Sequence, residues 1–578
     1  FNVFVGDESG TALASGDYNT ALGYQSLESE IGGQSSTAIG YRALYAQNTA
    51  SANYNTAVGM SAGHSITSGI FNTLIGGLTG DALDVGNSNI AIGTSALGSD
   101  TKGSRTVAIG LSALATQNFT SATDTYNTAV GYSAGNLVTT GIQNTLIGGL
   151  AGDAITTGSY NNAFGHQSLS TTTTGEQNSA FGRYSLNLNT TGSENTAVGN
   201  HSLNSNTTAD NNTAVGYYSL YANTTGTRNN ALGNLALTAN TTGDNNLALG
   251  SQALQANTTA DNNTAVGYAT LNVNTTGTAN IAVGKSALLA NTTANYNTAV
   301  GYHSLLSNTT ASNNTAVGTS SLGATITGGN NTALGWQAGL AVTGADNTVI
   351  GKNAGSGLTT PNQNTFVGSG SGSTITSGAN NTILGGYNGN QDGWDLRTAS
   401  NYSVLSDGDG NVKFVVDINR RTYFGGRGGG RVGALNIVGE IGASYVAVDF
   451  ERTNGGGRVG TIVTNVSSVS YNTSSDHRLK ENVADMTGAI DRVKQLSPKR
   501  FNFIADADTT VDGFLAHEAQ AIVAEAVHGT HNEVDDNGDA VMQGIDQSKL
   551  VPLLTGALKE AIAKIEDLEA RLTILEGV

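Results

Sequence analysis

The chain has 578 residues, with 78 glycines, 3 prolines and no cysteine, and charged residues make up only 12% of it. The absence of cysteine excludes disulfides, thiol catalysis and thiolate metal sites. Bulky apolar residues are too few for one large globular core, which leaves a polar linker or a solenoid with a narrow interior. A net charge of −18 disfavours nucleic acid and anionic membranes as partners.

The ends of the sequence give no sign of a membrane segment. No apolar run approaches the roughly 18 residues that a spanning helix needs, and no basic and apolar leader is present. The repeat described next is already under way by Asn19, so we read the chain as a mature product or a fragment. We expect no membrane insertion.

A short motif, Asn-Thr-Ala-Val/Ile-Gly, recurs along the first two thirds of the chain, for example at Asn127, Asn195 and Asn212. From Gly131 to Gly335 its glycine returns every 17 residues. Earlier and later copies keep this period with small insertions or deletions, which makes 22 copies in all. Such regular self-similarity favours a solenoid over a disordered linker.

A period of 17 residues is too short for two helices and a turn, but it holds two short strands and two turns. We therefore predict a β-solenoid shaft over residues 1–388. Val215 and Leu220 are expected to face the interior on either side of a bend at Gly216. The stretch 223–226, Asn-Thr-Thr-Gly, is expected to form a turn with unusual backbone angles.

These repeats resemble the head repeats of trimeric autotransporter adhesins and related repeats in bacteriophage tail fibres. The resemblance implies a homotrimer. A physical reason points the same way, because a coil with so few large apolar groups buries little surface alone, whereas three coils side by side share a core.

Two features of the shaft have a functional and a structural reading. The Asn-Thr-Thr tripeptides match the N-glycosylation pattern, but at this density turn elements are the better interpretation. A group of aromatic side chains could form a ladder on which sugars stack, although surface or trimer packing is the favoured reading. The group comprises Tyr217, Tyr218, Tyr302, His303 and Trp336.

Residues 389–474 are predicted to form a β-rich neck. Segments beginning at Val412, Ala434 and Ser444 are rich in β-branched residues between glycine-rich turns, which is typical of longer strands. The alternating oxygen ligands of residues 407–411 suggest a calcium loop, but its downstream Glu is missing, so a hairpin turn is predicted. The glycine-rich run from Gly425 lacks the Lys and Ser/Thr of a phosphate loop and is read as turns.

Helical patterns appear in the last hundred residues. Residues 488–496 and 514–527 are both predicted to be helices. Near the C-terminus apolar residues step alternately by four and three, which is the a/d seam of an intermolecular coiled coil whose oligomer order the pattern leaves open. The seam is Leu554, Leu558, Ala561, Ile565, Leu568, Leu572 and Leu575.

The stretch YNTSSDHRLKENV, residues 471–483, resembles the start of the intramolecular chaperone auto-processing domain of phage endosialidases, tail spikes and tail fibres. SPKRFNF from Ser497, GFLAHEAQ from Gly513 and the closing LVPLLTGALKEAI are also similar to that family. The resemblance covers residues 475–578. It implies an α/β chaperone domain in which Ser475 and Lys480 form a self-cleaving dyad, with the cut between Ser474 and Ser475.

The chemistry of such a dyad is coherent. A serine hydroxyl needs a base to become a nucleophile, and in a chain without cysteine a neutral lysine amine can fill that role. Only a desolvated, folded site favours the neutral amine. We therefore expect cleavage to wait for folding and assembly, and an oxyanion donor to exist that the sequence does not identify.

No metal site or cofactor is predicted. His517 and Glu518 begin like a zinc-protease helix, but Ala521 stands where the second His is required. Four more potential ligands are better explained as a solvated polar loop. They are His528, His531, Glu533 and Asp535.

Together these observations predict a mostly β, homotrimeric tail fibre for host attachment, matured by single-turnover serine autoproteolysis. The resemblances imply an extracellular location on the virion tail, with other tail proteins at the N-terminal end and a glycan or protein receptor on the host. Two alternatives stay open. One is a trimeric adhesin or filament on a bacterial surface, and the other is a polysaccharide-degrading tail spike, which would need a paired-carboxylate cleft.

Overall fold

The structure is a computed structural model. It describes residues 1–420, 422–424, 445–451, 458–464, 469–473, 475, 477–504, 506–535, 538 and 540–577. The predicted strand from Ala434, the glycine-rich run from Gly425 and Ser474 lie outside the described residues. The chain divides into two compact units, Phe1–Leu435 and Asn436–Val578, and each is described by itself.

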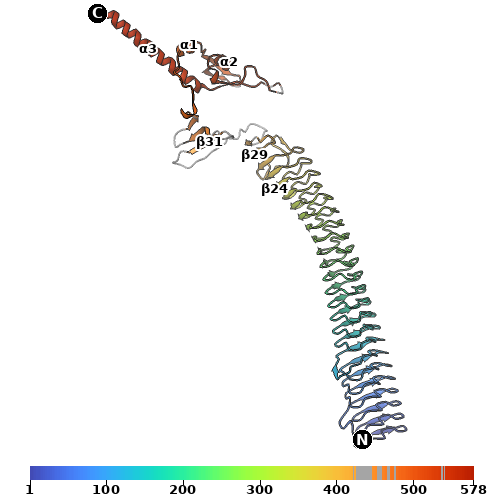
Figure 1. Cartoon of the computed structure of the whole chain (residues 1–578). Helices are drawn as coiled ribbons and strands as arrows, with labels where there is room; N and C mark the ends of the chain where they lie inside the picture. The colour runs from blue at the N-terminus through green and yellow to red at the C-terminus, as the bar shows by residue number, and fades with distance from the viewer. Residues whose placement is uncertain are drawn as a thin grey trace. The chain divides into compact units, whose positions relative to one another are not determined.

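Unit 1 is a β-solenoid in which coil after coil adds one three-residue strand to a single parallel sheet (Figure 1). Partners in neighbouring coils are in register, so Thr213 lies opposite Thr196 and Ala214 opposite Ala197. This confirms the predicted mostly β solenoid of 17-residue repeats. The strands are β1 (Val3–Val5), β2 (Thr20–Leu22), β3 (Thr37–Ile39), β4 (Thr56–Val58), β5 (Thr73–Ile75), β6 (Ile90–Ile92), β8 (Val107–Ile109), β10 (Thr128–Val130), β11 (Thr145–Ile147), β12 (Asn162–Phe164), β13 (Ser179–Phe181), β14 (Thr196–Val198), β15 (Thr213–Val215), β16 (Asn230–Leu232), β17 (Leu247–Leu249), β18 (Thr264–Val266), β19 (Ile281–Val283), β20 (Thr298–Val300), β21 (Thr315–Val317), β22 (Thr332–Leu334), β23 (Thr348–Ile350), β24 (Thr365–Val367) and β25 (Thr382–Leu384).

The interior of a coil is filled from two sides. The middle residue of the strand, Ala214 in β15, is fully buried, and so is Leu220 on the opposite side of the coil. Val215 was expected to face the interior and does not, because successive side chains of a strand alternate and Ala214 takes the inward place. Val215 lies partly exposed on the outer face of the sheet.

Two strands per coil were expected, but in the described part of unit 1 most coils from β1 to β25 contain one strand; a second, two-residue strand occurs in two of them, as β7 (Gly103–Ser104) and β9 (Thr123–Asp124). On the side of the coil opposite the sheet, residues adopt left-handed backbone angles that no strand has, with φ of 56° at Tyr218 and 49° at Leu220. Coils still bond to each other, since the Leu220 amide donates to the Ala236 carbonyl at 3.0 Å. Left-handed angles are found at Asn211, Tyr218 and Leu220. The 223–226 turn, where unusual angles were expected, has none of them.

Two ladders of buried asparagines run through the solenoid. In the first, the Asn that precedes most of the strands binds backbone, as when Oδ1 of Asn212 accepts the Asn229 amide at 2.9 Å. In the second, side chains bind each other, as when Nδ2 of Asn240 donates to Oδ1 of Asn223 at 2.8 Å. The ladders satisfy polar groups that the narrow interior cuts off from water.

The motif glycine is required by both conformation and space. Gly216 has a φ of 137°, which side-chain-bearing residues rarely adopt, and a Cβ there would lie 2.4 Å from the Gly233 carbonyl oxygen. Successive glycines stack in this way along the sheet edge. Glycine at this position is therefore a condition for stacking the coils.

The sheet continues past the predicted shaft boundary at residue 388, because β28 (Ser403–Ser406) pairs with β25 in parallel. It ends in the antiparallel strands β29 (Val412–Val416) and β30 (Thr422–Phe424). Short two-residue pairs complete unit 1. They are β7 (Gly103–Ser104) with β9 (Thr123–Asp124), and β26 (Asn390–Gln391) with β27 (Trp394–Asp395).

Unit 2 contains an antiparallel three-stranded sheet and a mixed C-terminal part. The sheet is β31 (Tyr445–Glu451), β32 (Arg458–Thr464) and β33 (Val469–Thr473). No helix in the described part of the chain is long and apolar enough to span a membrane. The C-terminal elements are η1 (His477–Leu479), α1 (Ala489–Val493), β34 (Lys499–Phe503), β35 (Asp506–Gly513), α2 (Ala516–Gln520), η2 (Ala524–Ala526), β36 (Val527–His528), β37 (Gly544–Ile545), η3 (Gln547–Lys549) and α3 (Leu550–Glu576).

Candidate functional site

Ser475 and Lys480, five residues apart, are brought together by the short helical turn η1. The Lys480 amide donates to the His477 carbonyl at 3.1 Å, which folds the chain back on itself. As a result, Nζ of Lys480 donates to Oγ of Ser475 at 2.7 Å. Both side chains are exposed in the single chain.

This distance lies within the reach of a general base, about 2.6–3.2 Å between heavy atoms. When the amine is neutral the same contact can reverse, so that the serine hydroxyl donates to Nζ and loses its proton along that line. The arrangement is therefore able to activate the hydroxyl once water is removed from it. Ser474, the other side of the predicted cut, lies outside the described residues.

A small core holds the elements that follow the Ser475–Lys480 pair. Glu560 of α3 accepts the amides of Ala489 and Ile490 at 2.8 and 2.9 Å. It thus caps α1, whose own N-cap, Gly488, has no side chain to do so. These bonds, led by that from Ile490, lower the pKa of the Glu560 carboxyl. Sequence patterns gave no hint of this contact, because the partners are about seventy residues apart. The core is Ala489, Val523, Ala526, Leu550, Leu553 and Ala557.

The predicted helices are present with shorter bounds. α1 ends at Val493 and α2 at Gln520, and the segment expected to continue α2 forms η2 and β36 instead. α3 packs its first turns into the core through Leu550, Leu553 and Ala557. The large residues of the predicted a/d seam stay exposed in the single chain, for example Leu568 at 58%. The coiled coil remains a prediction.

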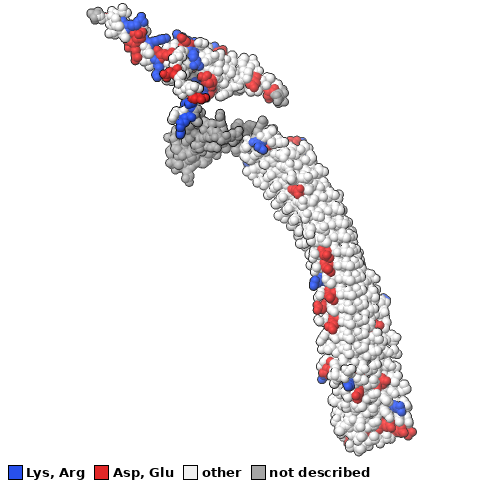
Figure 2. All heavy atoms as spheres, viewed as in Figure 1, with Lys and Arg blue, Asp and Glu red and all other residues white. Residues whose placement is uncertain are grey.

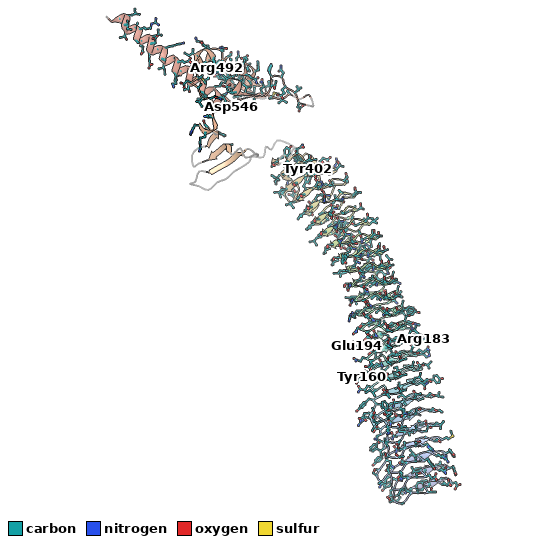
Figure 3. All side chains as sticks on the ribbon, viewed as in Figure 1. Tyr160, Arg183, Glu194, Tyr402, Arg492 and Asp546 are labelled. Atoms are coloured by element: carbon teal, nitrogen blue, oxygen red, sulfur yellow. The ribbon has the colours of Figure 1, made fainter. Side chains whose placement is uncertain are left out.

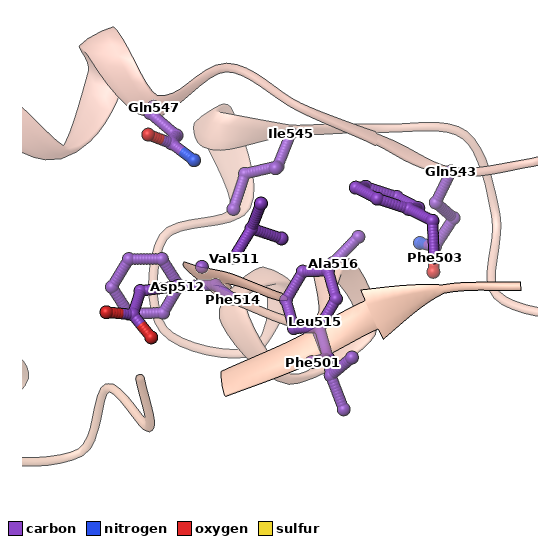
Figure 4. Close-up of a pocket in the computed structure, with 11 residues that line it drawn as sticks. Phe501, Phe503, Val511, Asp512, Phe514, Leu515, Ala516, Gln543, Ile545 and Gln547 are labelled. Carbon is purple, nitrogen blue, oxygen red and sulfur yellow. The ribbon is translucent and has the colours of Figure 1, made fainter. Parts of the chain in front are cut away.

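A cavity of about 480 Å³ opens beside the β34–β35 hairpin (Figure 4). Phe501 and Phe503 come from the SPKRFNF stretch, and Phe514 and Leu515 from GFLAHEAQ, while Ile545 closes the other side. Phe503 is largely exposed. The two stretches singled out in the sequence therefore meet at one apolar surface of the C-terminal unit.

Three of the residues considered as metal ligands have other partners. His517 stacks on His531 with ring centroids 4.5 Å apart, and Glu518 pairs with Lys499 at 3.5 Å. Within the described ranges no group of three or more His, Cys, Asp or Glu is placed to hold a metal.

The 407–411 segment forms the predicted hairpin turn between β28 and β29. Oδ1 of Asp407 accepts the amides of Asp409 and Asn411 at 3.1 and 2.8 Å. Hydrogen bonds from the Asn411 side chain and then Lys413 lower the pKa of Asp407 to about 2. The carboxylate thus holds the turn together.

The Asn-Thr-Thr asparagines are turn elements and not accessible acceptors. Asn223 is fully buried, and its Nδ2 donates to Oδ1 of Asn206 at 3.0 Å and to the Gly226 carbonyl at 2.9 Å. Glycosylation there would break the ladder. The burial of these asparagines therefore supports their interpretation as turn elements.

Acidic residues on the shaft also serve the backbone. Side chains project from every coil of the solenoid (Figure 3), and in Figure 2 Asp and Glu, drawn in red, gather on part of an otherwise mostly uncharged face. Asp210, Asp244 and Asp261 accept amides from the preceding coils at 2.6 to 2.7 Å. Their regular spacing follows from this coil-to-coil bond.

The aromatic candidates lie in two adjacent rows. Tyr217, Tyr302 and Trp336 directly follow motif glycines and are exposed, whereas Tyr218 and His303, one residue later, are partly buried. Tyr217 contacts Tyr218 and Tyr302 contacts His303, with ring centroids 4.4 and 3.7 Å apart. Both packing and an exposed stacking surface are thus present.

Residues 475–528 match a family described as "Chaperone of endosialidase". The match begins at Ser475 and contains Lys480, α1, the β34–β35 hairpin and α2. A domain of this family implies a self-cleaving intramolecular chaperone. No curated protein and no solved structure matches the chain.

Proposed function

We propose that this chain, with its chaperone-of-endosialidase domain at residues 475–528, is one protomer of a homotrimeric attachment fibre. The solenoid forms the shaft, and the C-terminal unit guides trimer folding and then cuts itself off between Ser474 and Ser475. The observation that carries the proposal is the 2.7 Å contact of Lys480 Nζ with Ser475 Oγ at the first residue of the matched domain.

The outer face of the parallel sheet supports the trimer. The third residue of each strand is aliphatic or aromatic and points outward, as Leu232 does at 48% exposure and Leu334 at 48%. Because every coil repeats this position in register, the exposed side chains form one apolar stripe along unit 1. A stripe of this kind marks an interaction surface, and two further copies present the same stripe.

The apolar seam of α3 supports the same conclusion at the other end of the chain. Leu554, Leu558 and Leu572 are each about half exposed or more, although they repeat at a/d positions. Three such helices would bury one another's seams. The shaft and the helix are separate surfaces, and both lack a partner for their apolar side chains within the described chain.

Exposure of the Ser475–Lys480 pair explains why cleavage would follow assembly. In the single chain both side chains are exposed to solvent. Partner chains would cover the pair, and a lysine acts as a general base in a desolvated site, so the pair becomes competent in the assembled fibre. Removal of the chaperone then prevents refolding and leaves the fibre stable for kinetic reasons.

Cleavage would proceed as an acyl shift followed by hydrolysis. Ser475 Oγ attacks the Ser474 carbonyl carbon while Lys480 Nζ takes the hydroxyl proton. The C–N bond between residues 474 and 475 breaks, and Lys480 Nζ passes the proton to the Ser475 nitrogen. An ester then links the residue 474 carbonyl carbon to Ser475 Oγ. Water then hydrolyses the ester and releases a fragment beginning at Ser475.

The test is denaturing electrophoresis and mass spectrometry of the purified full chain beside Ser475→Ala, Lys480→Ala and the control Lys494→Ala. The wild type and the control are expected to release a fragment that starts at Ser475, whereas the two dyad variants stay whole. Mass photometry should give trimers for all four chains. An uncut wild type, or a cut in Ser475→Ala, would refute the dyad, and a monomeric wild type would refute the fibre.

We assign the fibre to the virion tail, with its N-terminal end toward other tail proteins. The same two units would also suit a filament on a bacterial surface. Gold-labelled antibodies against unit 1 decide between them, since label on purified virus particles supports the first location and label on uninfected cells the second.

A further inference from the structure

The helix α3 carries two apolar faces that lie next to each other. One face is buried in the C-terminal core through Leu553 and Ala557, and the other carries the exposed seam residues Leu554 and Leu558. Each of the two buried residues directly precedes a seam residue, so both faces occupy the same turns of the helix. A partner helix that packed on the seam would therefore lie beside the contacts that α3 makes within its own chain.

The segment that begins shortly after Lys480 packs on α3. Asp485 and Met486 line a cavity of about 600 Å³ together with residues of the first turns of α3. A Cβ at Gly556 of α3 would lie 3.2 Å from Sδ of Met486 and 3.1 Å from Cβ of Ala489, so the two chain segments are in close contact. Figure 1 shows α1 beside the first part of α3. The helix that carries the seam is thus also the helix that holds this segment.

Glu560 joins the segment to α3 by hydrogen bonds in addition to packing. Its two carboxylate oxygens accept the amides of Ala489 and Ile490 at 2.8 and 2.9 Å. Hydrogen bonds to an ionised acceptor are stronger than those between neutral groups, and two of them from one carboxylate fix direction as well as distance. Glu560 lies one turn after the buried Ala557 and directly before Ala561 of the seam, so it stands where the two faces of α3 meet.

The position of Lys480 depends on how the following segment is held. Between Lys480 and the start of α1 at Ala489 the chain forms no helix or strand, and residues 481–488 are exposed. Contact with α3 fixes the far end of this segment. The contact of Lys480 Nζ with Ser475 Oγ is 2.7 Å long, and a displacement of about 1 Å in a reacting group can cost about a hundredfold in rate. A small shift of the segment is therefore enough to slow cleavage.

We propose that Glu560 is a positioning residue for self-cleavage, which ties the segment that carries Lys480 to the trimer-forming helix α3 and so makes the dyad competent on an assembled α3. The inference rests on the proposed self-cleavage and goes beyond it, because it names the contact through which assembly reaches the dyad. Glu560 acts through α1 and residues 481–488 and has no catalytic role of its own. The competing explanation is that Glu560 only stabilises the domain, and the experiment separates the two.

The experiment follows release of the fragment that begins at Ser475 from full-length chains made by cell-free translation, on denaturing gels of samples stopped at successive times. Glu560→Ala removes both acceptor oxygens and should slow release at least about tenfold, while mass photometry still shows trimers. Glu560→Gln keeps one acceptor oxygen and should release the fragment at an intermediate rate. Glu566→Ala, at an exposed position of the same helix, should match the wild type.

Val523→Ala is the matched control for stability. Val523 is buried in the same core, so its truncation lowers the melting temperature but leaves the hydrogen bonds of Glu560 in place. Melting temperatures are measured in chains that also carry Ser475→Ala, and all rates are taken below them. Val523→Ala should lower the melting temperature as Glu560→Ala does and still release the fragment within about twofold of the wild-type rate.

Each outcome decides the proposal. Release by Glu560→Ala at the wild-type rate overturns it, and equal slowing by Val523→Ala overturns it by assigning Glu560 to stability alone. Loss of trimers in Glu560→Ala also overturns it, because Glu560 would then act on assembly itself. Slow release by Glu560→Ala trimers, partial rescue by Glu560→Gln and normal release by Val523→Ala support it. A wild type that stays whole refutes self-cleavage and this inference together, whereas failure of the inference alone is seen only in the variants.

Discussion

Replacing one ladder asparagine tests how the solenoid is held together. In Asn212→Ala the buried Asn229 amide loses its acceptor, Oδ1 of Asn212 at 2.9 Å. The Gly226 carbonyl loses the Asn212 side chain as a donor but still accepts from Nδ2 of Asn223 at 2.9 Å. The substitution therefore leaves the Asn229 amide unpaired, whereas the Gly226 carbonyl keeps a partner. An unpaired buried amide costs about 1–3 kcal/mol, and with the small void we expect a loss of about 2–4 kcal/mol per chain.

The assay is unfolding in guanidinium, followed by circular dichroism, of full chains that carry Ser475→Ala and so keep the chaperone, with the native shaft, Asn212→Ala or Asn234→Ala. Asn234 is exposed, so its replacement should cost less than about 0.5 kcal/mol. Asn212→Ala should unfold at clearly lower denaturant and, because coils stabilise only their neighbours, unit 1 should open first around β15 in hydrogen exchange. Equal stabilities for the two variants would refute the ladder as a source of stability.

Three further predictions concern the stacking, the cap and the seam. Gly216→Ala should abolish the yield of soluble protein, because its Cβ would lie 2.4 Å from the Gly233 oxygen. Gly408→Ala, whose Cβ would have no atom within 4 Å, should express normally. Equal yields of soluble protein for the two variants would contradict this. The Glu560 carboxyl has a pKa below its ordinary value of 4.5. Its stabilisation of α1 is therefore complete above pH 4.5 and is lost as the pH falls through the lowered pKa. The melting temperatures of wild type and Glu560→Gln should differ at about pH 7 and converge in acid. Leu568→Lys should abolish both trimers and cleavage, while Glu566→Lys, off the seam, should keep both; cleavage by a monomeric Leu568→Lys would disconnect the cut from assembly.

The sequence alone determined the period, the solenoid and the place of the chaperone domain. Glycine recurs every 17 residues because each coil has one position with the geometry of Gly216, where φ is 137° and a Cβ would lie 2.4 Å from the next coil. Only glycine tolerates both. The motif around Ser475 likewise fixed where the matched family begins. Such features are local, so a pattern of residue types is enough to find them.

Other features were decided by the tertiary structure. Val215 faces outward because Ala214 takes the inward place in the strand, and the far side of the coil is a left-handed turn at Leu220 instead of a second strand. The cap of α1 by Glu560 joins residues about seventy positions apart. Whether a side chain lies inside, outside or across a contact depends on neighbours that only the folded coil supplies, and no repeat in the sequence encodes that directly.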